Sequence, residues 1–209
     1  MATNIAAGAD TRLWNAEADE HDPISARTFG FWLYLLSDAL IFAGLFASYA
    51  VLDNSFNAAG GPIAAQIVHP LEGLIQTFAV LGSVLSYSLA TVAMKKGSRT
   101  GVIHGILGAI VLSGVFLGIG AHDLLGLIAQ GDGPDRSGFL SIFFTLIVSH
   151  GLHMVFGILW MLVMLVQVAR TGFNQDVVGR LLNLRLFWQF QASVWVCVYV
   201  YVYLLGGYN

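Results

Sequence analysis

The sequence is short of charged residues and of cysteine, and each shortage excludes a class of protein. Only 10% of the 209 residues are charged, whereas a soluble domain has about 25%. The formal net charge of −3 leaves no basic surface for nucleic acid. Because Cys197 is the single cysteine, an intrachain disulfide framework and a Cys-rich metal site are excluded. These shortages argue against a soluble domain and a nucleic-acid partner.

Apolar residues are abundant instead, at 57% of the chain, with a mean hydropathy of +0.76. Five apolar stretches each reach the roughly 20 residues that a transmembrane helix needs. They predict an all-α, polytopic membrane protein with a five-helix bundle in residues 29–209. The predicted spans are 29–52, 70–94, 101–121, 138–168 and 186–205. Residues 1–28 are polar and contain no apolar signal-peptide core, so we expect a poorly ordered cytoplasmic tail.

The basic residues predict the orientation of this bundle. The N-terminal tail and the second and fourth loops carry eight Lys or Arg residues, whereas the other flanking segments carry only Arg136. Lys and Arg are enriched on the cytoplasmic side of membrane proteins. The N-terminus is therefore predicted to be cytoplasmic and the C-terminus periplasmic.

Small side chains recur at every fourth position in the first three spans, which places them on one face of each helix. Such faces permit close backbone packing in lipid, although Gly, Ala and Ser are also common in membrane helices generally. The sets are Ala39, Ala43 and Ala47; Gly82, Ser86 and Ala90; and Gly101, Gly105, Ala109 and Ser113.

Two polar stripes with the same spacing follow in the last two spans. They predict hydrogen bonding between these helices or with a partner, worth about 0.6–2 kcal/mol per bond. The stripes are Ser141, Thr145, Ser149, His153 and Gly157 in the fourth span, and Gln189, Ser193 and Cys197 in the fifth.

Ionisable residues inside spans are costly and are functional candidates by default. Asp38 lies about 13 Å along its helix from Phe29, near the middle of the bilayer. It is either a carboxylate of a proton path or a protonated group that bonds a neighbouring helix. Glu72 begins the second span, where the helix dipole is sufficient to account for a carboxylate.

His150 and His153 lie three residues apart on the fourth span. A bis-histidine haem is disfavoured because His104, the other histidine within a span, lies near the end of its helix. A dinuclear metal site would need carboxylates beside the two histidines, and the fourth span has none. Hydrogen bonding between helices is the simplest interpretation, and a small transporter or metal-binding protein that uses Asp38 with these histidines is the alternative from another class.

Several motifs resemble subunit III of the haem–copper respiratory oxidases. HGLHMVFG at 150–157 is the most recognisable, and the first span is similar to the family helix whose mid-membrane acidic residue follows a serine, here Asp38. HPLEGL at 69–74 resembles the start of the next family helix, and FWQFQASVW at 187–195 resembles the last family helix. Five spans together with GPDRSGF at 133–139, which contains Asp135 and Arg136, resemble the bacterial cytochrome o ubiquinol oxidase branch.

The resemblance implies a subunit without redox chemistry of its own. It implies that subunit I carries haem b, haem o and copper, and that this chain packs on subunit I beside subunits II and IV. Binding of phospholipid, support of proton uptake and a place in the bacterial inner membrane are further expectations. Subunit III of a cytochrome c oxidase is the alternative within the family.

The chain departs from the family pattern at three positions. Gln189 and Ala192 stand where the last helix usually has a His and an Asp, and Gly120 replaces a Glu. A nearby acidic position is retained as Asp123. Asp38 is therefore the main candidate for a proton-path carboxylate, and Glu72, His150, His153, Gln189 and Ser193 are expected to be structural polar groups between helices.

Overall fold

The computed structural model describes residues 23–208, and this part of the chain is helical without a β-strand. Five of its helices are long and apolar enough to cross a membrane. They are α1 (Pro23–Leu52), α4 (Pro70–Lys95), α5 (Arg99–Ala129), α6 (Gly138–Thr171) and α7 (Gln175–Val198), which continues as the π-helical η2 (Tyr199–Leu205). The short helices are α2 (Ser55–Ala58), α3 (Ala64–Ile67) and α8 (Gly206–Tyr208).

All five predicted spans lie in long helices, and three of these helices extend well beyond the predicted bounds of the spans. Helix α1 begins at Pro23, so residues 23–28 of the predicted tail are helical, and residues 1–22 lie outside the described part. Helix α5 extends to Ala129, beyond residue 121, and α7 begins at Gln175, well before residue 186. Hydropathy locates the part of a helix that lies in hydrocarbon, whereas the hydrogen-bonded helix continues into polar sequence beyond it.

Side-chain caps and a proline fix where four of the long helices start. The side-chain oxygens of Ser98, Ser137 and Asn174 each accept a hydrogen bond from the backbone N–H three residues later, at 3.2, 3.1 and 2.8 Å. These bonds satisfy N–H groups that the first turn leaves without partners. Pro70 occupies the first turn of α4, where the missing N–H costs nothing.

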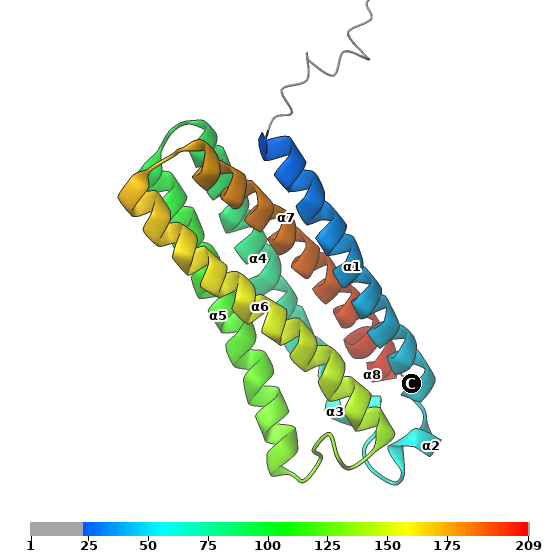
Figure 1. The fold of residues 1–209 in the computed structure, drawn as a ribbon. Helices are drawn as coiled ribbons and strands as arrows, with labels where there is room; N and C mark the ends of the chain where they lie inside the picture. The colour runs from blue at the N-terminus through cyan, green and yellow to red at the C-terminus, as the bar shows by residue number, and fades with distance from the viewer. Residues whose placement is uncertain (1–22, 209) are drawn as a thin grey trace, which may run out of the picture.

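The five long helices form a closed bundle (Figure 1). Contacts run around it in the order α1, α6, α5, α4, α7 and back to α1, while α6 also packs directly on α7. The connection between α4 and α5 and the connection between α6 and α7 lie at the same end of the bundle as the start of α1 (Figure 1). Lys95, Lys96 and Arg99 border the first connection, and Arg170 and Arg180 lie in the helices that flank the second. The basic residues thus gather at one end, which agrees with the premise of the predicted orientation.

Small residues bring α4 and α5 into close contact, as their spacing predicts. A Cβ added to Gly105 would lie 2.6 Å from the Cβ of Ala90 and 2.8 Å from its backbone nitrogen. The equivalent atom on Gly108 would lie 2.4 Å from the Ser86 hydroxyl, which itself donates to the carbonyl of Gly105 at 2.9 Å. The small faces of these two spans therefore pack on each other. By contrast, Ala43 and Ala47 of α1 are exposed on the outer surface of the bundle and contact no small face of another helix in it.

Neutral hydrogen bonds join α4 to α7 at three levels. The indole of Trp195 donates to Thr77 Oγ1 at 3.0 Å, and that of Trp188 donates to Ser83 Oγ at 3.0 Å. Nearer the basic end, the Tyr87 hydroxyl donates to the carbonyl of Leu181 at 3.0 Å. All these side chains except Thr77 are at most 2% exposed. Buried indole N–H and phenol O–H groups need such partners, so the bonds fix how α7 sits against α4.

Candidate functional site

Asp38 on α1 and His153 on α6 form a pair of ionisable side chains that joins two membrane-spanning helices away from their ends. Asp38 Oδ1 lies 3.1 Å from His153 Nε2, and the carboxyl is 4% exposed. The buried face of α1 brings it there, because Leu35, Asp38 and Phe42 recur at helical spacing and all point into the bundle. The carboxyl that the sequence singled out therefore faces another titratable group.

The hydrogen-bond partners of His153 define the proton content of this pair. His153 Nδ1 lies 2.7 Å from the carbonyl oxygen of Ser149, which can only accept, so Nδ1 carries a proton. A second proton then belongs either to Asp38 or to His153 Nε2. The two arrangements have the same total charge and differ by the transfer of one proton across the 3.1 Å hydrogen bond. The pair can therefore hold and exchange one proton.

The other oxygen of Asp38 has no partner in the described part of the chain. Oδ2 is buried and accepts no hydrogen bond there. The histidine side of the pair is more open, since the His153 side chain is 27% exposed and lines a cavity of about 230 Å³ with Tyr34, Phe156 and Phe187. Access to the pair therefore runs past the imidazole rather than past the carboxyl.

His150 lies one turn away but has a different environment. Its side chain is 1% exposed, and Nε2 lies 3.1 Å from the carbonyl oxygen of Gln191 on α7, to which it donates. The rings of Phe42, Phe116 and Trp195 pack around the imidazole, with centroid distances of 6.4, 5.6 and 5.5 Å. His150 therefore joins α6 to α7 inside an aromatic shell, whereas His153 faces α1.

The polar stripe of the last span does not face another helix in residues 23–208, so contact with a partner subunit is the alternative that stays a prediction. Ser193 is exposed, and its hydroxyl donates to the carbonyl of Gln189 within α7. The residue of α7 that bonds α6 is Gln191, whose backbone carbonyl accepts from His150. Gln191 is fully buried, and the sequence analysis missed it. Its spacing from Trp188 and Trp195 places it on their helix face, so the buried tryptophans were the available signal. Spacing places Gln189, Ser193 and Cys197 on one face of α7 but does not determine what that face contacts.

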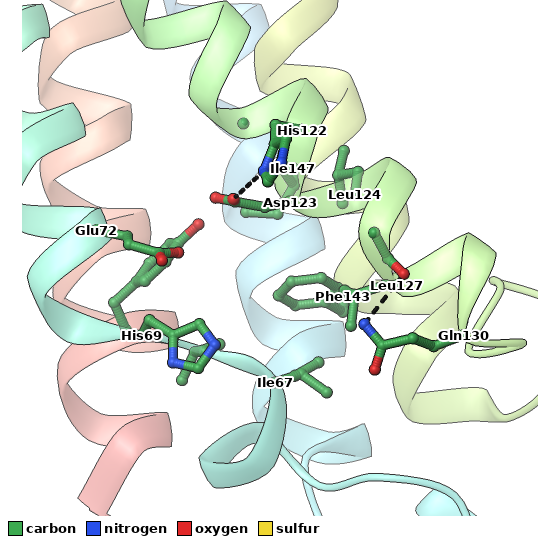
Figure 2. A pocket seen from close by; sticks show the side chains of 14 residues that line it. Ile67, His69, Glu72, His122, Asp123, Leu124, Leu127, Gln130, Phe143 and Ile147 are labelled. Atoms are coloured by element: carbon green, nitrogen blue, oxygen red, sulfur yellow. Dashed lines mark hydrogen bonds and ion pairs between the residues drawn. The ribbon is translucent and has the colours of Figure 1, made fainter.

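Glu72 is exposed in the first turn of α4, as the helix-dipole interpretation requires. No hydrogen bond or ion pair joins its carboxylate to another helix in the described part of the chain (Figure 2), so its expected role between helices stays a prediction. Asp135 and Arg136 both lie exposed in the loop between α5 and α6. Arg136 pairs with Asp132, and its guanidinium packs near Gly61. This loop therefore borders the connection between α2 and α3.

Metal and haem alternatives find no support in the described residues. Within 23–208, no three His, Cys, Asp or Glu side chains come together in a way that could hold a metal ion. His104 is exposed on α5 rather than opposite His150 or His153. Asp38 and His153 thus remain a two-residue pair, and their chemistry is proton exchange and hydrogen bonding.

The sequence is similar to known proteins over most of its length. The family described as "Cytochrome c oxidase subunit III" matches residues 19–207. A "Cytochrome bo(3) ubiquinol oxidase subunit 3" of Pseudomonas aeruginosa is 41% identical over 90% of this chain and 88% of its own length. Its counterpart in Pseudomonas putida is 40% identical over 89% of each chain, and a "Quinol oxidase subunit 3" of Bacillus subtilis is 30% identical over 85% and 86%. The chain therefore belongs to the cytochrome c oxidase subunit III family and is a multi-pass subunit of a haem–copper oxidase.

Proposed function

We propose that the chain is the third subunit of a proton-pumping terminal oxidase that oxidises ubiquinol and reduces O2 to water. The observation that carries the choice of electron donor is the identity of 41% over most of both chains to a relative named as a ubiquinol oxidase subunit. The alternative, a cytochrome c oxidase, has the support of the family description alone. Haem b, haem o and copper belong in subunit I under this proposal, and this chain supplies no ligand to them.

Within that complex, the subunit packs on subunit I beside subunits II and IV in the bacterial inner membrane. Its own chemical contribution is the Asp38–His153 pair. One shared proton has two positions along a 3.1 Å hydrogen bond, on Asp38 or on His153, and its exchange with the surroundings takes place on the more open side, at His153. The pair supports proton uptake by the complex, while the neutral contacts around it keep the subunit folded.

Co-purification tests the assignment to the oxidase. The chain is tagged in its native membrane and extracted in mild detergent, and the haem that accompanies it is measured spectroscopically. We expect haem b and haem o in fixed proportion to the chain, with ubiquinol oxidation that exceeds cytochrome c oxidation. A chain that emerges alone and colourless would exclude the assignment. Stoichiometric Zn, Cu or Fe on that isolated chain would favour a metal-binding protein instead.

Replacement of Asp38 by Asn tests the proposed role of the pair. The amide can still hydrogen-bond His153 but cannot exchange the proton, so assembly should be retained. We expect fewer protons pumped per electron during sustained turnover, or an inactivation that is several-fold faster. Asp135→Asn, an exposed carboxyl outside the pair, is the matched control and should behave as the unmodified protein. If pumping and lifetime are unchanged in Asp38→Asn, Asp38 is a structural hydrogen-bonding group only.

A further inference from the structure

We propose that the outward face of α7 is a docking surface for a transmembrane helix of another subunit, and that this helix presents a carboxylate to Arg185. The surface is the α7 stripe, which we define as Arg185, Gln189 and Ser193, at every fourth position. The predicted span began at residue 186 and left Arg185 out, whereas α7 begins at Gln175. The inference rests on the proposed function for the presence of other subunits.

The neighbours of α7 fix the direction of the stripe. Trp188 bonds Ser83 on α4, and Phe190 packs on Phe42 of α1 with a centroid distance of 6.5 Å. At about 100° per residue, Phe190 lies about 200° around the helix from Trp188, and the α7 stripe spans the sector from about 60° to about 140° between them. Val196 falls in the same sector and is 38% exposed. The stripe therefore lies between the contacts with α4 and α1 and faces away from the bundle.

Arg185 lies well inside the hydrocarbon region. Ser83, which Trp188 bonds, is at the middle of α4, and Arg185 precedes Trp188 by three residues, about 5 Å along the axis. From the other side, Arg185 follows Asp176, which pairs with Arg27 at the basic end, by nine residues, or about 14 Å. Half of the hydrocarbon thickness is about 15 Å, so the backbone of Arg185 is about 10 Å from the headgroups.

The two larger side chains of the stripe have no partner in residues 23–208. Arg185 forms no ion pair or hydrogen bond there, and its Nε is buried without an acceptor. The side-chain amide of Gln189 bonds nothing there either, since only its backbone carbonyl accepts, from Ser193. Charged residues within a membrane almost always face protein or water and pair with carboxylates or carbonyls. An outward Arg185 at this depth therefore requires a protein partner against α7.

The chemistry of the stripe describes that partner. A guanidinium only donates hydrogen bonds, so Arg185 needs an acceptor, and a carboxylate is the acceptor that matches its planar fork. The backbone carbonyls of a membrane-spanning helix are already engaged in its own hydrogen bonds, which leaves a side chain to supply this acceptor. A lipid phosphate does not account for Gln189, which lies one turn nearer the middle of the membrane. A helix that runs along α7 can meet both residues.

Photo-cross-linking in the native membrane tests the proposal. A benzophenone amino acid replaces Ser193, the exposed member of the stripe, and the labelled residues are identified by mass spectrometry. We expect labels on one transmembrane helix of another subunit, which carries an Asp or Glu about two turns nearer the basic end, level with Arg185. The same replacement of Val111, which is 64% exposed on α5, is the control and should not label that helix. Labels confined to lipid or to this chain, or a labelled helix without such a carboxylate, would overturn the proposal.

Substitution of Arg185 provides the second measurement. Arg185→Gln should reduce the labelled subunit in purified complexes several-fold, whereas Arg185→Lys keeps the charge and should retain most of it. Arg180→Gln is the matched control, because Arg180 is exposed and bonds Gln167 within this chain. Arg185→Glu, combined with an Arg in place of the partner's carboxylate, should restore the subunit. Normal content of that subunit in Arg185→Gln would also overturn the proposal.

Two parallel measurements separate this inference from other causes of loss. The amount of the chain in the membrane shows whether Arg185→Gln still folds, and it should equal that of Arg180→Gln. Haem that accompanies the unmodified chain reports on the oxidase assignment. Haem together with labels on lipid alone would refute the docking surface and leave the assignment intact. A labelled helix with its carboxylate but without haem would refute the assignment and leave the docking surface intact.

Discussion

Helices α4 and α1 are joined to the rest of the bundle in contrasting ways. Helix α4 lies against α5 through small residues and against α7 through three neutral hydrogen bonds. None of these bonds involves a group that titrates near neutral pH. The share of its apolar segment that is buried is 39%, compared with 22% for α1. Helices α4, α5 and α7 therefore form a frame, and the contacts of α4 within it do not change with protonation.

Helix α1 depends on fewer contacts, and one of them can gain or lose a proton. It rests on α6 and α7 through the face that contains Leu35, Asp38, Phe42 and Tyr49. Its other charged contact, Arg27 with Asp176, is mostly exposed, and water and salt weaken such a pair. The comparison shows that the titratable pair lies at the least covered helix, where a change in protonation alters a helix contact without disturbing the frame.

The largest effect is expected where the frame has no free space. Gly105→Leu should lower the free energy of unfolding by about 3 kcal/mol or more, since an added Cβ meets the backbone of Ala90, which cannot move aside. Thermal unfolding of the detergent-solubilised protein measures the loss. Gly114→Leu on the same helix meets open space and is the control. Equal melting temperatures for the two variants would show that α4 and α5 are not held by close packing.

A smaller effect is expected from the hydrogen bond between Asp38 and His153, which joins α1 to α6. His153→Leu leaves the buried carboxyl of Asp38 without its partner, at a cost of about 1–3 kcal/mol, and should reduce the amount of assembled complex. In Asp38→Leu/His153→Leu, both polar groups are replaced, and much of the loss should be recovered. Quantitative immunoblotting of purified complexes measures the subunit content. Normal content in His153→Leu would mean that the pair does not hold α1 in place.

A single neutral bond of the frame should be worth less. Trp188→Phe removes the indole N–H that Ser83 Oγ accepts, and we expect a loss of about 1 kcal/mol in the free energy of unfolding. Trp188→Phe and Ser83→Ala should not add, because each removes the same bond. Additive losses in the double variant would show that the bond contributes little and that ring packing holds α7 to α4.

The smallest effect is expected on the outward stripe of α7. Ser193→Ala removes a hydroxyl that bonds only within its own helix, so stability should change by less than about 0.5 kcal/mol. Thermal unfolding of the isolated subunit provides the measurement. The assembled complex provides a second one, because a large loss of stability there alone would identify Ser193 as a contact with another subunit.

Much of the frame could be predicted from local sequence. Small residues at every fourth position, such as Ala90 and Gly105, predict a small face on each of two successive spans. Because the connection between these spans is short, the two helices must lie side by side. The ends of the helices were predicted less well. In α7 the apolar sequence begins only after Arg180 and Arg185, although the helix itself already begins at Gln175. A polar side chain at a helix end can remain in the interface while the helix persists.

The sequence by itself determined that five helices cross the membrane, that Asp38 is the notable carboxyl among them, and that no Lys or Arg lies at their centres. These properties follow from composition and period along one chain. Only the tertiary structure decided that Asp38 meets His153, 115 residues away, that Gln191 and not Gln189 bonds α6, and that Ser193 points outward. The physical reason is that spacing places residues on a common face, whereas the neighbour of that face depends on how all five helices pack together.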